Sequence, residues 1–138
     1  MMHWTYPLIG LPWEPGAAGP ATFDCWGLVR YIAKLRLGID MPVVQVGGEH
    51  NVPAIKQAAR EGGWRQVEGE QLENDIVMMA SATGRHVGYM VAVDTRLMLL
   101  HCNGRMTTRG PVGNVMLQQL RHVACDGYGQ FETWRRAS

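Results

Sequence analysis

Phe23-Asp24-Cys25-Trp26-Gly27-Leu28-Val29-Arg30 places a polar capping residue directly before an amphipathic helix. The Asp24 carboxylate can accept a hydrogen bond from a backbone N–H in the first helical turn. Apolar residues then recur at helical spacing, at Leu28, Val29, Ile32 and Leu35. We therefore predict a helix that begins at about Cys25 and ends near Leu37-Gly38, where glycine favours a stop.

Cys25 lies in the first turn of this helix, on its apolar side. The thiol should therefore face other protein rather than solvent. Unpaired amides and the dipole at a helix N-terminus favour an anion, which lowers a thiol pKa from its free value of about 8.5. The position fits a reactive cysteine, and it also fits a small buried apolar residue. A facing histidine would distinguish the two.

Length and composition favour one domain and exclude several classes of partner. With 138 residues, of which 46% are hydrophobic and 18% charged, the chain suits a single domain over residues 1–138. Thirteen basic and twelve acidic side chains leave a formal charge of +1, without the concentrated basic face that nucleic acid requires. The three cysteines are odd in number and far apart, so we expect no disulfide framework and a reducing compartment.

The N-terminal segment carries no export or membrane signal. It has neither a basic leader nor a long apolar run, and no window elsewhere approaches the ~20 apolar residues of a membrane span. We expect cytoplasmic synthesis without a signal peptide and no membrane partner. Glycine and proline follow, so after a short helix around Trp4–Ile9 we predict a loop that leads to Cys25. Trp13, in this loop, either walls a cleft or covers the edge of the core.

The rest of the chain predicts a second helix and then a small sheet. Asn51 as N-cap and Pro53 in the first turn indicate a helix that runs to Gly62-Gly63. From Trp64 onward, short segments rich in β-branched and aromatic residues replace the helical pattern. The predicted strands are Trp64–Val67, Ile76–Met79, His86–Val93, Leu97–His101 and Tyr128–Trp134. Helices followed by a meander of strands indicate an α+β fold with an antiparallel sheet.

Two histidines meet on one face of this predicted sheet. Only residues 94–96 separate the strands that contain His86 and His101, which is short enough for a tight hairpin. With a two-residue turn at positions 94 and 95, Gly88 pairs with His101. His86 then lies diagonal to His101 on the same face, with Cβ atoms ~7 Å apart, and Gly88 leaves that face open. A three-residue turn would separate the two rings.

This pair supplies what the cysteine lacks. One imidazole can take the thiol proton and later protonate the leaving amine, while the second fixes the tautomer and orientation of the first. We assign Cys25 as nucleophile, His86 as general base and His101 as the orienting residue, with no cofactor.

A zinc site is the competing use of these side chains. His101-Cys102 and His122-x-x-Cys125 together offer four groups that bind zinc. Neighbouring strand residues point to opposite faces, so His101 and Cys102 cannot easily share one ion. We therefore expect no metal.

Taken in order, these motifs resemble those of the NlpC-type cysteine peptidases, a papain-like superfamily that cuts peptidoglycan stem peptides. The matching segments are Trp13, Asp24-Cys25-Trp26-Gly27-Leu28-Val29, Asn74-Asp75-Ile76-Val77, His86-Val87-Gly88-Tyr89 and Leu100-His101. The resemblance covers roughly residues 9–102. It implies a papain-like fold, in which the N-terminal helix carrying the cysteine packs on a small antiparallel sheet. It also implies a murein peptide substrate, cut at an amide after γ-D-glutamate, with Trp13, Asp24, Trp26 and Gly88 lining the substrate site.

Ile9-Gly10-Leu11-Pro12-Trp13 and the residues around Cys25 are most similar to the branch found in phage and prophage tail-assembly proteins. That branch implies tail proteins as partners and the virion tail as a location. Trp13 stands where tyrosine is common and lacks its hydroxyl, so oxyanion stabilisation would rest on the backbone amide of Cys25. Trp26 replaces a common serine, which would narrow or reshape the pocket. The alternative function is a structural tail-tip or assembly component with the same fold and weak or no catalysis.

Overall fold

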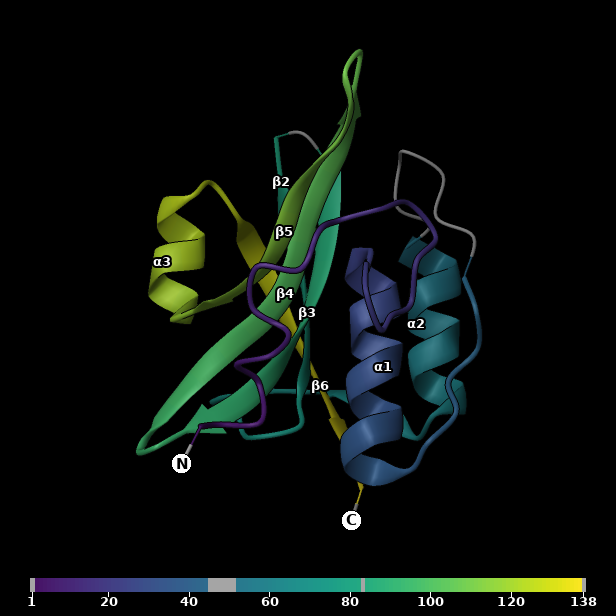
Figure 1. Cartoon of the computed structure of the whole chain (residues 1–138). Coiled ribbons are helices and arrows are strands. Elements are labelled where there is room, and N and C mark those ends of the chain that lie inside the picture. Colours follow the sequence, from purple (N-terminus) through teal and green to yellow (C-terminus); the bar gives the residue numbers. More distant parts are fainter. Residues whose placement is uncertain (1, 45–51, 83, 138) are drawn as a thin grey trace.

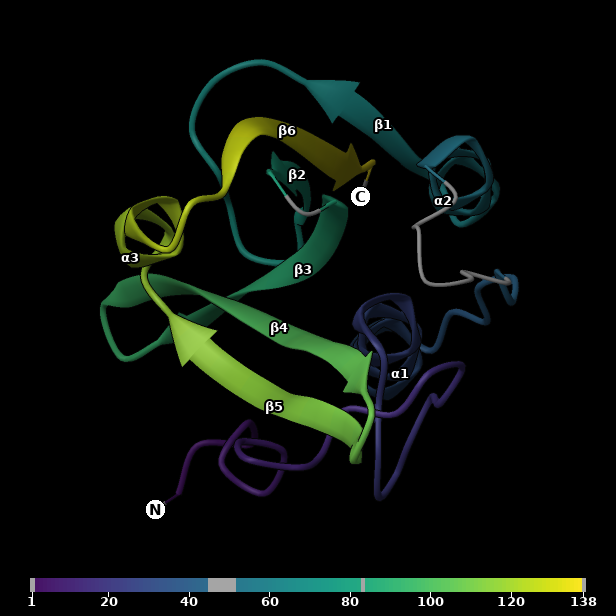
Figure 2. The same cartoon turned by 90° about the horizontal axis from the view of Figure 1, so that it is seen from above.

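The computed structural model describes residues 2–44, 52–82 and 84–137, in which helices flank one antiparallel sheet (Figure 1). The elements are α1 (Cys25–Leu37), α2 (Val52–Glu61), β1 (Trp64–Val67), β2 (Ile76–Ser81), β3 (Gly84–Val93), β4 (Arg96–Thr107), β5 (Gly110–Gln118), α3 (Leu120–Cys125) and β6 (Gly129–Arg136). Helices α1 and α2 lie on one side of the sheet and α3 on the other (Figures 1 and 2). The predicted α+β fold, with the cysteine helix packed on an antiparallel sheet, is confirmed.

Helix α1 has both predicted ends. The Asp24 side chain accepts a hydrogen bond from the Gly27 N–H, and Gly38 ends the helix in the left-handed conformation with φ 71°. The predicted apolar side is buried, with one exception: Leu35 is 54% exposed. Trp26 and Ala33 extend the buried side in the other direction around the helix, which turns Leu35 outward.

The sheet has the strand order β1-β6-β2-β3-β4-β5, so the last strand lies between the first two. The β3–β4 hairpin has the predicted two-residue turn, because Val93 pairs with Arg96 and Val91 with Met98. Asp94 adopts a positive φ of 56°, as such tight turns require. The predicted register, on which the histidine pairing depends, is therefore confirmed.

Three parts of the chain differ from the sequence prediction. Strand β4 continues to Thr107, and its continuation pairs with β5, which was not predicted because glycine and proline interrupt its apolar pattern. Helix α3 was also missed. Residues 4–10 form successive turns with bonds such as Leu8 N–H to Thr5 O (2.9 Å) instead of a short helix. The predicted N-cap of α2, Asn51, lies outside the described residues.

The N-terminal loop covers the edge strand β5. The Gly10 N–H donates to the Val115 carbonyl (2.8 Å), the Val115 N–H to the Leu11 carbonyl (2.9 Å), and the Trp13 N–H to the Gly113 carbonyl (3.0 Å). These bonds occupy backbone groups that an edge strand would otherwise expose. They also hold the loop that leads into α1 in place against the sheet.

Candidate active site

Asp24 ties the loop to the helix that carries the cysteine. One carboxylate oxygen accepts from the Gly27 N–H (2.6 Å) and the other from the Gly16 N–H (3.0 Å). The residue is 6% exposed. Both oxygens therefore accept from backbone amides and hold the start of α1, and the place of Asp24 in the substrate site stays a prediction.

The Cys25 thiol is 2% exposed, and burial raises its pKa above the ordinary value. The charge of Asp24 adds to this rise, while the backbone N–H groups of Trp26 and Val87 lower the pKa by a smaller amount. The rise in the thiol pKa caused by desolvation of the thiolate is larger than the lowering expected from the helix N-terminus. The expectation of a lowered thiol pKa is therefore wrong, because burial raises it.

His86 and His101 form a direct pair, as the hairpin register predicted. His86 Nε2 lies 2.8 Å from His101 Nδ1, and the two ring centroids are 5.0 Å apart. His101 Nε2 in turn lies 2.7 Å from Gln118 Oε1 on β5. Both histidines are buried, at 4% and 1% exposed. Adjacent antiparallel strands thus bring two imidazoles and an amide into one line.

The thiol and the histidine pair belong to the same small region. The Val87 N–H, next to His86 in the chain, interacts with the Cys25 sulfur. The Tyr128 ring centroid lies 5.2 Å from that of His86. Burial raises the Tyr128 pKa, a hydrogen bond from Asn103 lowers it, and Cys25 raises it further. Sequence reasoning placed Tyr128 only at the start of a strand, and no local pattern pointed to its neighbours.

Gly88 makes room for its neighbours on the sheet. A Cβ atom at this position would lie 2.8 Å from the Leu99 side chain and 3.0 Å from the His101 Cβ. Contacts this short would push His101 away from His86. The small residue is therefore needed by the histidine pair, and this accounts for Gly88 without the predicted substrate contact.

The two tryptophans near the cysteine have packing positions. Trp13 is half-buried, packs against the core and lies so close to Gly104 that a Cβ there would clash with its ring. Of the two roles predicted for Trp13, the structure thus shows core cover. Trp26 is 1% exposed, and its Nε1–H donates to the Pro42 carbonyl (3.0 Å). Its ring fills the core, so the expectation that Trp26 lines the substrate site does not agree with this placement.

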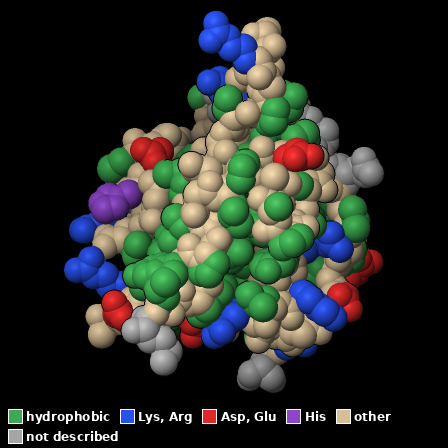
Figure 3. Space-filling model, viewed as in Figure 1, with side chains coloured by type: hydrophobic (Ala, Val, Ile, Leu, Met, Phe, Trp, Pro, Cys, Tyr) green, Lys and Arg blue, Asp and Glu red, His purple; other side chains and the backbone are tan. Residues whose placement is uncertain are grey.

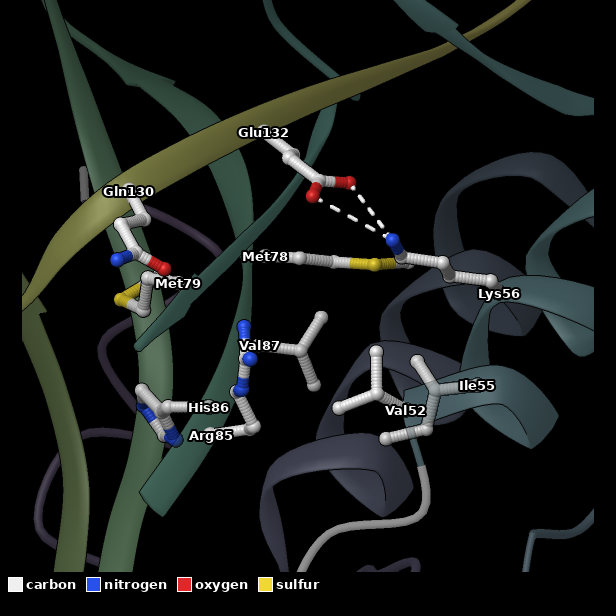
Figure 4. A pocket seen from close by; sticks show the side chains of 10 residues that line it. All are labelled: Val52, Ile55, Lys56, Met78, Met79, Arg85, His86, Val87, Gln130 and Glu132. Atoms are coloured by element: carbon white, nitrogen blue, oxygen red, sulfur yellow. Dashed lines mark hydrogen bonds and ion pairs between the residues drawn. The ribbon is translucent and has the colours of Figure 1, made fainter. Parts of the chain in front are cut away.

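A pocket opens beside His86, between α2 and the strands β2, β3 and β6 (Figure 4). Its wall is apolar near Ile55 and Val87, while Lys56 and Glu132 form an ion pair at 3.2 Å on one side. The Arg85 side chain extends into the same space (Figure 4). No sequence pattern predicts this pocket, because its walls come from elements far apart in the chain.

The four groups considered for zinc are dispersed. Cys102 Sγ donates to the Phe23 carbonyl (3.2 Å), whereas His101 is occupied by His86 and Gln118. His122 and Cys125 are exposed. Within residues 2–44, 52–82 and 84–137, no group of three or more histidine, cysteine or acidic residues could hold a metal ion.

None of the helices in the described part of the chain is both long and apolar enough to traverse a lipid bilayer.

Charged side chains are dispersed on the face shown in Figure 3. Acidic and basic groups alternate around a largely apolar and neutral centre, and basic side chains also gather at the tip of the β4–β5 hairpin. That face has no continuous basic surface.

We predict that acidification below about pH 6.5 destabilises the fold through His101. Burial lowers the His101 pKa below the ordinary 6.5, although Gln118 and Asp126 oppose this. As the pH falls through this window the unfolded chain binds the proton first, so the free energy of unfolding decreases. Urea unfolding at about pH 7.5 and about pH 5.5 measures this change. His101→Gln should show a smaller decrease, and an equal decrease in both proteins would contradict the assignment.

A cysteine at the N-terminus of a helix, packed on an antiparallel sheet that carries a histidine pair, defines a papain-like fold. The chain belongs to the NlpC/P60 family, whose model matches residues 10–124. This is a family of cell-wall cysteine peptidases and amidases. No curated protein is similar enough to the chain to count as a relative.

Proposed function

We propose that this protein hydrolyses amide bonds in peptidoglycan stem peptides, with residues 1–138 acting as one catalytic domain. Cys25 is the nucleophile, His86 the general base and His101 the residue that orients His86. The observation that carries the proposal is the 2.8 Å contact between His86 Nε2 and His101 Nδ1, beside a cysteine at the start of α1. Membership of the NlpC/P60 family supports the choice of substrate class.

The proposed reaction takes account of the raised pKa of the Cys25 thiol. As Cys25 Sγ attacks the carbonyl carbon, its proton passes to His86, and the backbone N–H of Cys25 stabilises the oxyanion. His86 then gives the proton to the leaving amine as the C–N bond breaks and a thioester remains. Water attacks the thioester, its proton returns through His86 to the sulfur, and the free acid leaves. Cys25 and His86 therefore end as they began.

We further propose an amide after γ-D-glutamate as the scissile bond and a phage or prophage tail as the setting. The segments 9–13 and 23–29 support this finer assignment, through their resemblance to the tail-assembly branch. A docking role with weak or no catalysis is the second candidate. The observation in its favour is the burial of both Cys25 and His86, at 2% and 4% exposed.

A pair of synthetic stem peptides tests the proposal. One contains the γ-D-glutamyl amide, and its matched control contains the same residues joined through the α-carboxyl group. Mass spectrometry of the products should show a new free amine from the γ-linked peptide only. Equal cleavage of both peptides would refute the linkage preference. Failure to cleave either peptide or intact murein would refute the hydrolase and leave the docking role.

A further inference from the structure

We infer that Gln118 and Asp126 are positioning residues that determine which ring nitrogen of His86 takes the thiol proton. The inference rests on the proposed function, because it concerns the same site. It is carried by a line of hydrogen bonds that starts at Asp126, after α3, and passes through Gln118 and His101 to His86.

The Asp126 carboxylate sets the direction of this line. An ionised carboxylate can only accept hydrogen bonds, so the group of Gln118 that faces it must be the amide nitrogen. Gln118 Nε2 donates to Asp126 Oδ2 at 3.2 Å. The amide oxygen, Oε1, is consequently the atom that faces His101 Nε2, at 2.7 Å. Asp126 thus fixes the orientation of the Gln118 amide. His101 alone would not fix it, because a ring nitrogen can either donate or accept a hydrogen bond.

The Gln118 oxygen then fixes the tautomer of His101. Because this oxygen only accepts, His101 Nε2 must carry the hydrogen. Burial lowers the His101 pKa, so the ring holds a single proton and its Nδ1 bears a lone pair. That lone pair accepts from His86 Nε2–H at 2.8 Å. In neutral His86 the basic nitrogen is therefore Nδ1, and this nitrogen takes the proton from Cys25.

The opposite tautomer of His101 is unfavourable because of the contact that it would force between Gln118 and Asp126. If His101 carried its proton on Nδ1, the Gln118 amide would have to turn and place its oxygen against the Asp126 carboxylate. Two acceptors at that separation repel each other and lose the hydrogen bond. The charge of Asp126 also raises the His101 pKa, so it stabilises positive charge that develops along the line during proton transfer. Among the described residues, Asp126 after α3 acts on His101 through its charge, and the Tyr128 ring before β6 lies 5.2 Å from the His86 ring.

Nitrogen-15 NMR of the histidine rings tests the inference without turnover. In the wild type, both His86 and His101 should show the Nε2–H tautomer. In Gln118→Ala, which removes the accepting oxygen, His101 should become a mixture of tautomers. On the murein peptide, kcat should fall roughly tenfold with KM unchanged. Asp126→Ala changes an exposed residue and leaves the core intact, so it provides a second variant in which a smaller tautomer shift is expected.

A double substitution tests whether the tautomers depend on the order of donors and acceptors in these hydrogen bonds or only on how the side chains pack. In Gln118→Glu with Asp126→Asn, the carboxylate at 118 still accepts from His101, and the amide at 126 donates to it. The tautomers and most of the kcat should return. Gln118→Glu alone keeps an acceptor against His101 but places it beside the Asp126 carboxylate, so it should restore the tautomers and kcat less completely than the double variant. Nδ1–H on His101 in the wild type, or unchanged tautomers in Gln118→Ala and Asp126→Ala, would overturn the inference. The expected tautomers in a protein that cuts no peptide would support this inference and refute the hydrolase.

Discussion

Replacing Cys25 or His86 by alanine is expected to abolish amide hydrolysis, with kcat/KM reduced roughly 10⁴-fold or more for each. In the proposed reaction Cys25 supplies the bonding electrons, and His86 accepts the proton from a buried thiol whose pKa is raised. Because nucleophile and base act as one unit, the double variant should be no slower than either single variant. Product formation from the γ-linked stem peptide, followed by chromatography, gives the three rates.

Cys125→Ala is the matched control for this experiment. Cys125 is a free, exposed cysteine, so its loss should leave kcat/KM unchanged. Hydrolysis that survives in Cys25→Ala would exclude Cys25 as nucleophile. An equal loss of kcat/KM in Cys125→Ala would mean that the loss comes from a general disturbance of the fold rather than from removal of the nucleophile.

Trp26→Ala is expected to lower the free energy of unfolding by about 3–5 kcal/mol. The ring is 1% exposed and its indole nitrogen donates to the Pro42 carbonyl, so truncation leaves a cavity and removes the donor of that carbonyl. This is a large share of the ~5–15 kcal/mol by which domains are stable. Urea unfolding of the wild type and the variant at the same pH measures the difference.

Trp26→Phe separates packing from substrate binding. Phenylalanine fills most of the same volume but lacks the indole N–H, so it should cost less stability than alanine. If Trp26 only packs, KM for the stem peptide should stay at the wild-type value in this variant. A raised KM with unchanged stability would instead restore Trp26 to the substrate site.

Local sequence signals predicted the parts of the site that depend on short-range geometry. Asp24 and Gly38 marked the ends of α1, and the two-residue turn at Asp94 was enough to place His86 beside His101. Such features are decided by a few neighbouring residues, whose conformational preferences are strong.

The rest of the site depends on burial and on contacts between distant segments. The thiol pKa followed from desolvation, which the sequence of a helix N-terminus does not report. Gln118, Asp126 and Tyr128 reach the histidine pair from a part of the chain where glycine and proline concealed the strand pattern. The pairing of β5 with β4 brings Gln118 to His101, and no local sequence pattern predicts this contact.

Because β6 lies between β1 and β2, the sheet is complete only once residues 129–136 are present. A ribosome delivers Cys25, His86 and His101 long before it delivers residues 129–136, and until then β1 has no neighbour in the sheet. Tyr128 arrives only with that last strand, and Asp126 just before it. A nascent chain that has not reached residue 129 therefore carries Cys25, His86 and His101 in an unfinished sheet.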